Sequence, residues 1–143
     1  MNDKELLTDW AVTWLKHKDI FLKQITQIEE HTGEYDVMVR KTTQDQFVLI
    51  RPQLSDLKEL APNLKEKNVY VFVLNTKANV DAVLQNWYAL IKNPKLCMVF
   101  VNPRSSTETK WVLYPATHER ITERSALKRG LYALFETVEV WVG

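Results

Sequence analysis

The chain has 143 residues, of which 45% are hydrophobic, and its 19 basic and 18 acidic side chains give a formal net charge of +1. A chain of this length fits one domain that buries roughly 70% of its unfolded surface. Its apolar content excludes general disorder. The balanced charge predicts no global attraction to nucleic acid or to an anionic membrane, although it leaves room for a local basic patch.

The single cysteine, the length of the apolar runs and the N-terminus indicate which covalent chemistry and which cellular location to expect. Cys97 is the single cysteine, so no internal disulfide forms and a cysteine-ligated zinc site is disfavoured. The longest apolar runs, 69–74 and 96–101, are too short to span a bilayer. The charged N-terminus lacks the apolar core of a signal peptide. We therefore expect a cytoplasmic protein without membrane contact.

The N-terminal region has the periodicity of an amphipathic helix. Its apolar stripe recurs at three and four residues and consists of Leu6, Leu7, Trp10, Ala11, Trp14 and Leu15. The stripe resumes with Phe21, Ile25 and Ile28, so either one helix covers about 3–31 or it breaks near His17–Asp19. Gly33 is the predicted stop, which places His31 in the last helical turn.

A β-hairpin is predicted over residues 34–51, with its turn at Thr42–Asp45. Pro52 lacks an N–H donor and ends the second strand. A short helix is expected next, with Asp56 as its N-cap and Glu59 completing a capping box.

Two continuous apolar runs, 69–74 and 96–101, are typical of strands covered on both faces. Between them Asn79 is predicted to cap a helix whose apolar side chains are Val80, Val83, Leu84, Trp87, Leu90 and Ile91. A strand, a helix and a second buried strand form a βαβ crossover, so we expect the two strands to be parallel.

The last third of the chain predicts a strand over 110–114, a helix capped by Thr122, and a terminal edge strand over 138–142. Gly130, inside that helix, suggests close packing against the sheet. If the valines of the edge strand face inward, Trp141 points outward as an interface anchor; the alternative is that the first helix covers it. Together these elements predict one α/β domain over residues 1–143, with a central mixed sheet flanked by helices.

Several catalytic classes lack their motifs. With Gly33, Gly130 and Gly143 as the only glycines, there is no phosphate-binding loop. The three histidines are far apart in the sequence, so no metal site is expected. Cys97 lies inside an apolar run, which favours an inert buried thiol.

Basic residues gather late in the chain. Arg104 and Lys110 bracket a loop, and Arg120, Arg124 and Lys128 follow at intervals of four, which would align them on one helix edge. Such a stripe suits phosphate contacts, but interleaved glutamates also fit an ordinary solvated face. Both interpretations stay open.

The order of elements, with the run from Val69 to Lys77, the helix bearing Trp87 and the strand ending at Asn102–Pro103, resembles the restriction-endonuclease-like superfamily, the PD-(D/E)XK nucleases. The resemblance covers about half of the chain. It implies a sheet preceded by a helix and a strand ending in an acid-x-Lys motif. In such a site two carboxylates hold a divalent cation and the lysine assists the attacking water.

Carried onto this chain, the resemblance assigns the lysine to Lys77, but Asn75 replaces the acid two residues earlier. The remaining acid would be Asp56 or, less well placed, Asp36. We therefore expect a catalytically degenerate member, with Mg²⁺ required only if the nuclease activity persists. DNA or RNA would contact Lys77, Arg104, Arg124 and Lys128, directly or in support of a partner that processes nucleic acid. The alternatives are a homodimerisation or protein-interaction module built on Trp141, and an active Mg²⁺-dependent nuclease.

Overall fold

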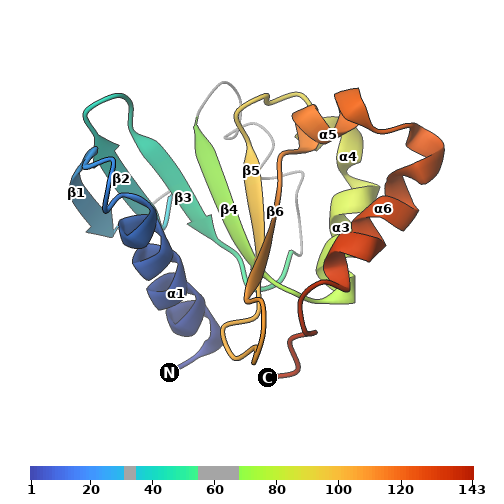
Figure 1. The fold of residues 1–143 in the computed structure, drawn as a ribbon, viewed down its shortest axis with the longest axis horizontal. Helices are drawn as coiled ribbons and strands as arrows, with labels where there is room; N and C mark the ends of the chain where they lie inside the picture. The colour runs from blue at the N-terminus through green and yellow to red at the C-terminus, as the bar shows by residue number, and fades with distance from the viewer. Residues whose placement is uncertain (31–34, 55–67) are drawn as a thin grey trace.

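A computed structural model describes residues 1–30, 35–54 and 68–143 and shows a six-stranded sheet with helices on both faces (Figure 1). The strands lie side by side in chain order. They are β1 (Ile25–Glu30), β2 (Val37–Lys41), β3 (Gln46–Ile50), β4 (Val69–Leu74), β5 (Cys97–Val101) and β6 (Lys110–Leu113).

The sheet is mixed. β1, β2 and β3 form an antiparallel meander, β3, β4 and β5 are parallel, and β6 returns antiparallel to β5. The predicted hairpin is therefore confirmed as β2–β3. The parallel crossover is also confirmed, because Tyr70 to Leu74 pair in parallel with Cys97 to Val101.

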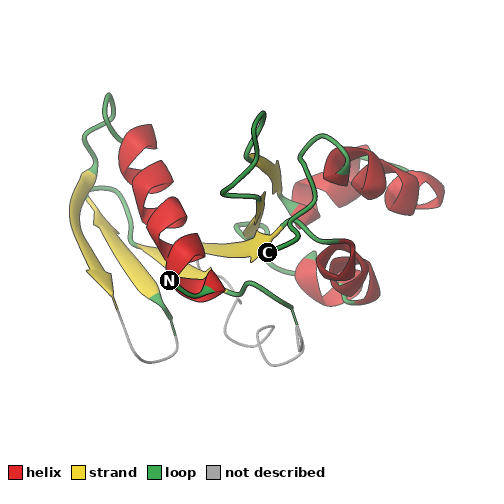
Figure 2. Ribbon diagram, turned by 90° about the horizontal axis from the view of Figure 1, so that it is seen from below, coloured by secondary structure: helices red, strands yellow, loops and turns green. Residues whose placement is uncertain are grey.

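Helix α1 (Asp3–Lys18) packs on one face of the sheet (Figure 2). Asn2 caps it by accepting a hydrogen bond from the Glu5 N–H, and Leu7, Ala11 and Leu15 are its buried residues. They join a core cluster with Val48, Phe72 and Val99 from the sheet.

The longer helix over 3–31 is wrong, because α1 ends at Lys18 and β1 begins at Ile25. A β-bulge between Ile25 and Gln27 explains the misleading spacing. In a regular strand Ile25 and Ile28 would face opposite sides, but the extra residue lets both pack against the α1-side cluster.

The other face carries helices α3 (Lys77–Gln85), α4 (Trp87–Leu90) and α6 (Leu127–Phe135). Val80, Val83, Trp87 and Leu90 are buried there as predicted. The N-cap is Thr76 rather than Asn79, and the single predicted helix is two helices that meet at Asn86.

The C-terminal region differs from the prediction in its helices. Pro115 begins helix α5 (Pro115–Ile121), and Thr122 ends that helix instead of capping the next one. A short 3₁₀ turn, η1 (Arg124–Ala126), then leads into α6. Beyond the backbone of its own helix and its two chain neighbours, no atom lies within 4 Å of where a Cβ on Gly130 would stand, so the expected close packing is wrong.

Residues 138–143 follow α6 without forming a strand. Val138 and Trp141 are buried, whereas Val140 and Val142 are 48% and 92% exposed. The predicted orientation is therefore confirmed for Val138 and wrong for Val140, Trp141 and Val142. Trp141 is 9% exposed and belongs to the α1-side core cluster, which removes the basis for an outward interface anchor.

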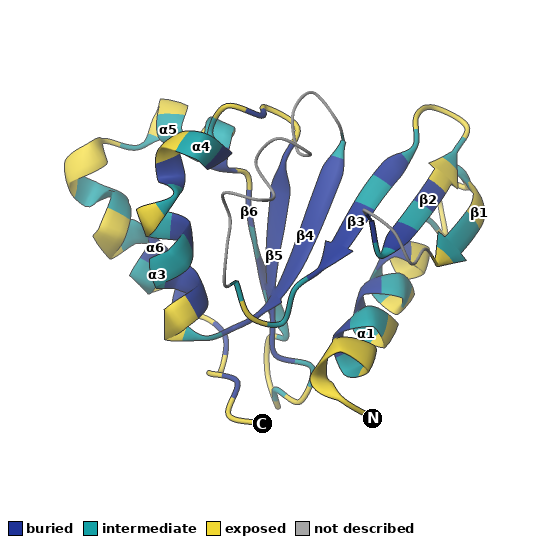
Figure 3. Cartoon of the chain, turned by 180° about the vertical axis from the view of Figure 1, so that it is seen from behind, coloured by how far each residue is buried: buried dark blue, intermediate teal, exposed yellow. Residues whose placement is uncertain are grey.

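Burial is concentrated in the three central strands, of which β4 and β5 are buried at every residue (Figure 3). The predictions for His31, Gly33 and Asp56 fall outside the described residues. None of the helices within the described ranges is long and apolar enough to cross a membrane.

Candidate functional site

The carboxyl ends of β3, β4 and β5 meet at one edge of the sheet, because these strands are parallel. Arg51, Asn75 and Asn102 directly follow those strands. The edge is where an α/β sheet usually binds ligands, and the nuclease resemblance also places its chemistry there.

Asn75 is fully buried and its side chain is committed to the protein interior. Its Nδ2 donates hydrogen bonds to the carbonyl oxygens of Phe135, Val138 and Glu139, at 3.2, 3.0 and 3.3 Å. Its Oδ1 accepts from the indole N–H of Trp111 at 2.8 Å. Asn75 thus ties the C-terminal segment to β4, and its amide oxygen faces an indole rather than a ligand.

Lys77 lies two residues further on, as the first residue of α3, and its side chain is exposed. Asp56 falls outside the described residues. Asp36, the other acid considered, contacts Lys4 and Arg51 and makes no described contact with Lys77. Because Asp56 is not described, the trio of Asp56, Asn75 and Lys77 stays a prediction, and the alternative acid, Asp36, is engaged elsewhere.

Asp36 precedes β2 at this same edge and forms a compact ion cluster. One carboxylate oxygen lies 2.7 Å from Lys4 Nζ, and the other lies 2.5 Å from Arg51 Nη1 and accepts the Ile50 N–H at 2.8 Å. Burial raises the pKa of Asp36, but these partners outweigh burial and hold the pKa below its ordinary value. The carboxylate is thus neutralised by its neighbours.

Other candidate chemical groups remain apart. No three His, Cys, Asp or Glu side chains in residues 1–30, 35–54 and 68–143 are grouped as metal ligands. Cys97 is fully buried and burial raises the pKa of its thiol to about 11, as expected for an unreactive cysteine.

The late basic residues do not form one helix stripe, because α5 ends at Ile121 and α6 begins at Leu127. Arg124 binds Glu119 at 2.8 Å and stacks 4.5 Å from the centre of the Tyr88 ring. Arg104 lies in the loop between β5 and β6, with its guanidinium carbon 5.2 Å from the centre of the Trp141 ring. Arg124 is therefore engaged by the protein itself.

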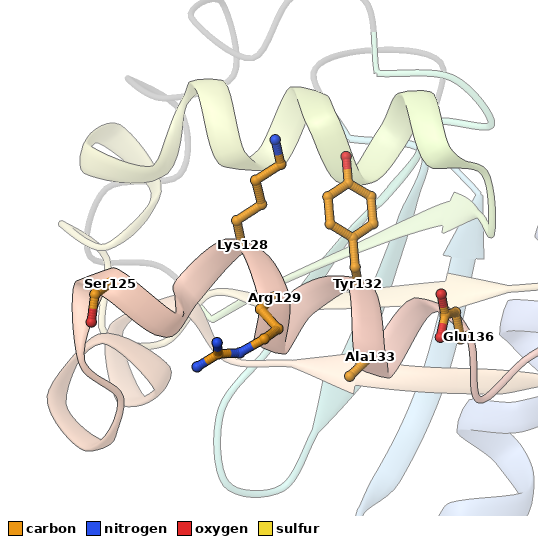
Figure 4. Close-up of a pocket in the computed structure, with 6 residues that line it drawn as sticks. All are labelled: Ser125, Lys128, Arg129, Tyr132, Ala133 and Glu136. Atoms are coloured by element: carbon orange, nitrogen blue, oxygen red, sulfur yellow. The ribbon is translucent and has the colours of Figure 1, made fainter.

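Lys128 lines a shallow hollow on α6 (Figure 4). Lys128 and Tyr132 rise from α6 toward α3, and the Tyr132 hydroxyl donates a hydrogen bond to Asp81. Glu136 also lines the hollow, so its charge is mixed. The hollow offers no converging set of groups for one ligand.

A different surface combines aromatic and basic groups on the α1 side of the sheet. Trp10 and Trp14 stack with ring centres 5.8 Å apart, and both rings are partly exposed. Lys18 Nζ lies 4.5 Å and Lys110 Nζ 5.9 Å from the centre of the Trp14 ring. We call this surface, with Tyr114, the basic–aromatic face.

The basic–aromatic face is partly exposed: Lys18 is exposed, whereas Trp10, Trp14 and Lys110 are half-buried. Helix α1 packs against β3 and β4, and none of the described helices is drawn over β6 on this side (Figure 1). Tyr114 is 42% exposed and directly follows β6, whose last residue, Leu113, pairs with Met98 of β5. Arg104 and Trp141 extend the same side toward the carboxyl edge.

The apolar stripe of the first helix predicts core packing for Trp10 and Trp14, and both do pack against the α1-side cluster while staying partly exposed; the sequence did not indicate the face that they form with Lys110. One signal was present: Trp10, Trp14 and Lys18 are spaced by four, which places them on the same side of a helix. Lys110 lies in β6 and Tyr114 directly follows it, and only the sheet topology brings β6 beside β5.

Comparison with known proteins gives no relative: no family model, no curated protein and no solved structure matches the chain.

Proposed function

We propose that this chain binds single-stranded nucleic acid on its basic–aromatic face and does not cleave it. The observation that carries the proposal is the stacked Trp10–Trp14 pair with Lys18 and Lys110 placed over Trp14. Exposed bases stack on aromatic rings, while lysine and arginine neutralise the phosphates between them.

Single strands suit this surface better than a duplex. A duplex hides its base faces, so it would use the cations but not the indole rings. Trp10 and Trp14 lie on α1 and Lys110 lies on β6, which are both regular elements, so the platform is formed before any ligand arrives. Of the four cations expected from sequence, Arg104 belongs to this side of the sheet.

The absence of cleavage is proposed because Asn75 and Asp36 are both occupied by the protein. Asn75 contacts Trp111 and the C-terminal segment, and Asp36 contacts Lys4 and Arg51. Neither side chain is directed to a shared point where a cation and a scissile phosphate would meet.

The experiment is a fluorescence-anisotropy titration of labelled single-stranded DNA, single-stranded RNA and a matched duplex. We expect the single strands to bind more tightly, with affinity that falls steeply between about 50 and 200 mM salt. The double variant Lys18→Glu, Lys110→Glu should weaken binding about tenfold or more, since two phosphate contacts become repulsive.

Lys128→Glu is the matched control, because it makes the same charge reversal on the α6 side. It should leave the affinity within about twofold. An equal loss in Lys128→Glu and in a single Lys110→Glu variant would refute the assignment of the face, and binding that ignores salt would refute phosphate contacts. Mg²⁺-dependent cleavage in the same mixtures would contradict a non-cleaving protein.

A further inference from the structure

An exposed apolar turn joins α1 to β1. Ile20, Phe21 and Leu22 are consecutive, and their exposed fractions are 53%, 93% and 63%. Figure 2 shows this connection extending past the end of α1 and the start of β1. Single exposed apolar residues are ordinary, but a contiguous group of three indicates a contact surface.

The apolar turn is held in a defined shape. The Lys23 N–H donates to the Asp19 carbonyl oxygen at 2.8 Å, and the Asp19 carboxylate accepts the N–H groups of Gln24 and Ile25, each at 2.9 Å. Lys23 has a φ of 52°, in the left-handed region that non-glycine residues rarely adopt. The turn therefore presents its apolar side chains at a preformed apex.

Lysines stand at the base of the apolar turn. Lys16 and Lys18 precede it, Lys23 closes it, and Lys41 comes from the end of β2, where the Thr42 N–H binds the Gln24 carbonyl oxygen at 2.9 Å. Burial and the charge of Lys18 lower the pKa of Lys41, against the opposing effect of Asp19. Lys41 pairs with Ile25 across the β1–β2 ladder, so it lies close to the end of the turn.

We propose that the apolar turn inserts into an anionic phospholipid surface, with Lys16, Lys18, Lys23 and Lys41 contacting the headgroups. An anionic bilayer has negatively charged headgroups directly above an apolar layer. The exposed apolar side chains of the turn suit the apolar layer, and the lysines around the turn suit the headgroups. A stable protein interface needs about 800 Å² from each partner, more than three side chains supply. The expectation of no membrane contact rested on total charge and on segment length, and neither describes a local turn.

The test is flotation of the full chain with phosphatidylcholine vesicles that either lack or contain about 30% phosphatidylserine, at low and at physiological salt. We expect binding only to the anionic vesicles. Phe21→Ser should reduce the partition coefficient about tenfold, since the most exposed apolar side chain of the turn is lost. Lys16→Glu combined with Lys23→Glu should abolish the preference for phosphatidylserine.

Val142→Ser is the matched control, because Val142 is 92% exposed but lies in the C-terminal segment. It should bind vesicles as the wild type does. Equal binding of wild type and Phe21→Ser, or equal binding to neutral and anionic vesicles, would overturn the proposal. A wild-type dimer in light scattering that Phe21→Ser converts to a monomer would overturn it in favour of a second copy.

The two proposed surfaces share Lys18, but Phe21 distinguishes between them. Phe21 lies outside the basic–aromatic face, so Phe21→Ser should bind oligonucleotides with unchanged affinity while losing the vesicles. Loss of both activities would show that the two surfaces are one site and would overturn the lipid assignment.

Discussion

At the carboxyl edge of the sheet, side chains of buried asparagines hydrogen-bond to backbone groups of segments that are not paired as strands. Asn79 accepts the Leu54 N–H and donates to the carbonyl oxygens of Pro52 and Leu74. Asn102 donates to the carbonyl oxygen of Glu139, which Asn75 also contacts. An amide carries both a donor and an acceptor, so it joins backbone segments that run in unrelated directions.

Asn75→Asp should destabilise the fold by about 3 kcal/mol, because a carboxylate would face three carbonyl oxygens that now accept from Nδ2. Urea denaturation measures the change. Gln85→Glu, on the exposed side of α3, adds the same charge and should change stability by about 0.5 kcal/mol or less.

The same variant restores an acid two residues before Lys77, yet we expect no Mg²⁺-dependent nuclease activity from it. A stable Asn75→Asp protein that cleaves DNA would show that the edge opens to accept a cation, against the packing described here.

Asp36 should give stability a distinct dependence on pH. Its folded pKa is lowered, so its contribution is present above the unfolded value of about 3.9 and is lost as the pH falls through the folded value. Asp36→Asn should cost about 1 kcal/mol at pH 7, and the deficit should shrink below about pH 4. Urea titrations at pH 7 and pH 3 measure it. A deficit that is equal at both pH values would contradict this assignment.

At the scale of elements, hydrophobic pattern predicted those strands that are buried on both faces. The runs at β4 and β5 contain almost nothing but β-branched, aromatic and long apolar residues, so their structure needs little tertiary information. β1 was missed because its bulge gives Ile25 and Ile28 a helical spacing. A register shift depends on the partner strand, which a local window does not contain.

The C-terminal segment was misassigned for a different reason. Its alternating valines fit a strand, but the carbonyl oxygens of Val138 and Glu139 accept from Asn75, and the Trp141 N–H donates to the Asn75 carbonyl oxygen. These hydrogen bonds take the place of the backbone pairing with a neighbouring strand that an edge strand would make. They arise from a residue more than sixty positions earlier, so the pattern of 138–142 alone carries no trace of them.

Gly130→Ala should stabilise helix α6. The new methyl group would meet no atom within 4 Å beyond its own helix backbone and chain neighbours, and alanine loses less backbone entropy than glycine in a helix. We expect a gain of about 0.5–1 kcal/mol, measured by thermal and urea unfolding. The reverse change at a neighbouring exposed position, Ala133→Gly, should lose a similar amount. A destabilised Gly130→Ala would mean that α6 packs more tightly than described.

At the scale of the whole molecule, total charge proved a poor guide to the surface. A net charge of +1 suggests an even mixture, but Lys18 and Lys110 share one side with exposed aromatic rings, while Arg124 is paired with Glu119. The candidate site therefore depends on which faces the topology brings together. The sequence shows that lysines and aromatic residues are present, but it does not show that they share a face.

Cys97 should report the opening of the entire sheet. It is fully buried in β5 and its pKa is raised to about 11, so at pH 8 a disulfide reagent should label it only when the protein unfolds. The labelling rate should rise with urea in parallel with global unfolding. Thr43→Cys, in the exposed β2–β3 turn, should instead label at once. Rapid labelling of native Cys97 would reveal a local opening of the centre.

The strand order, in which each strand lies beside its predecessor in the chain, bears on how the molecule assembles. No strand must be threaded between two others that have already paired, so a growing polypeptide can extend the sheet from one side only. The hydrogen bond from Asn75 to the Val138 carbonyl oxygen forms last in this order of assembly, because Val138 is synthesised long after β4. If synthesis pauses after β6, the sheet is complete but the carboxyl ends of its parallel strands lack the contacts with the C-terminal segment. We expect chaperones to bind this intermediate.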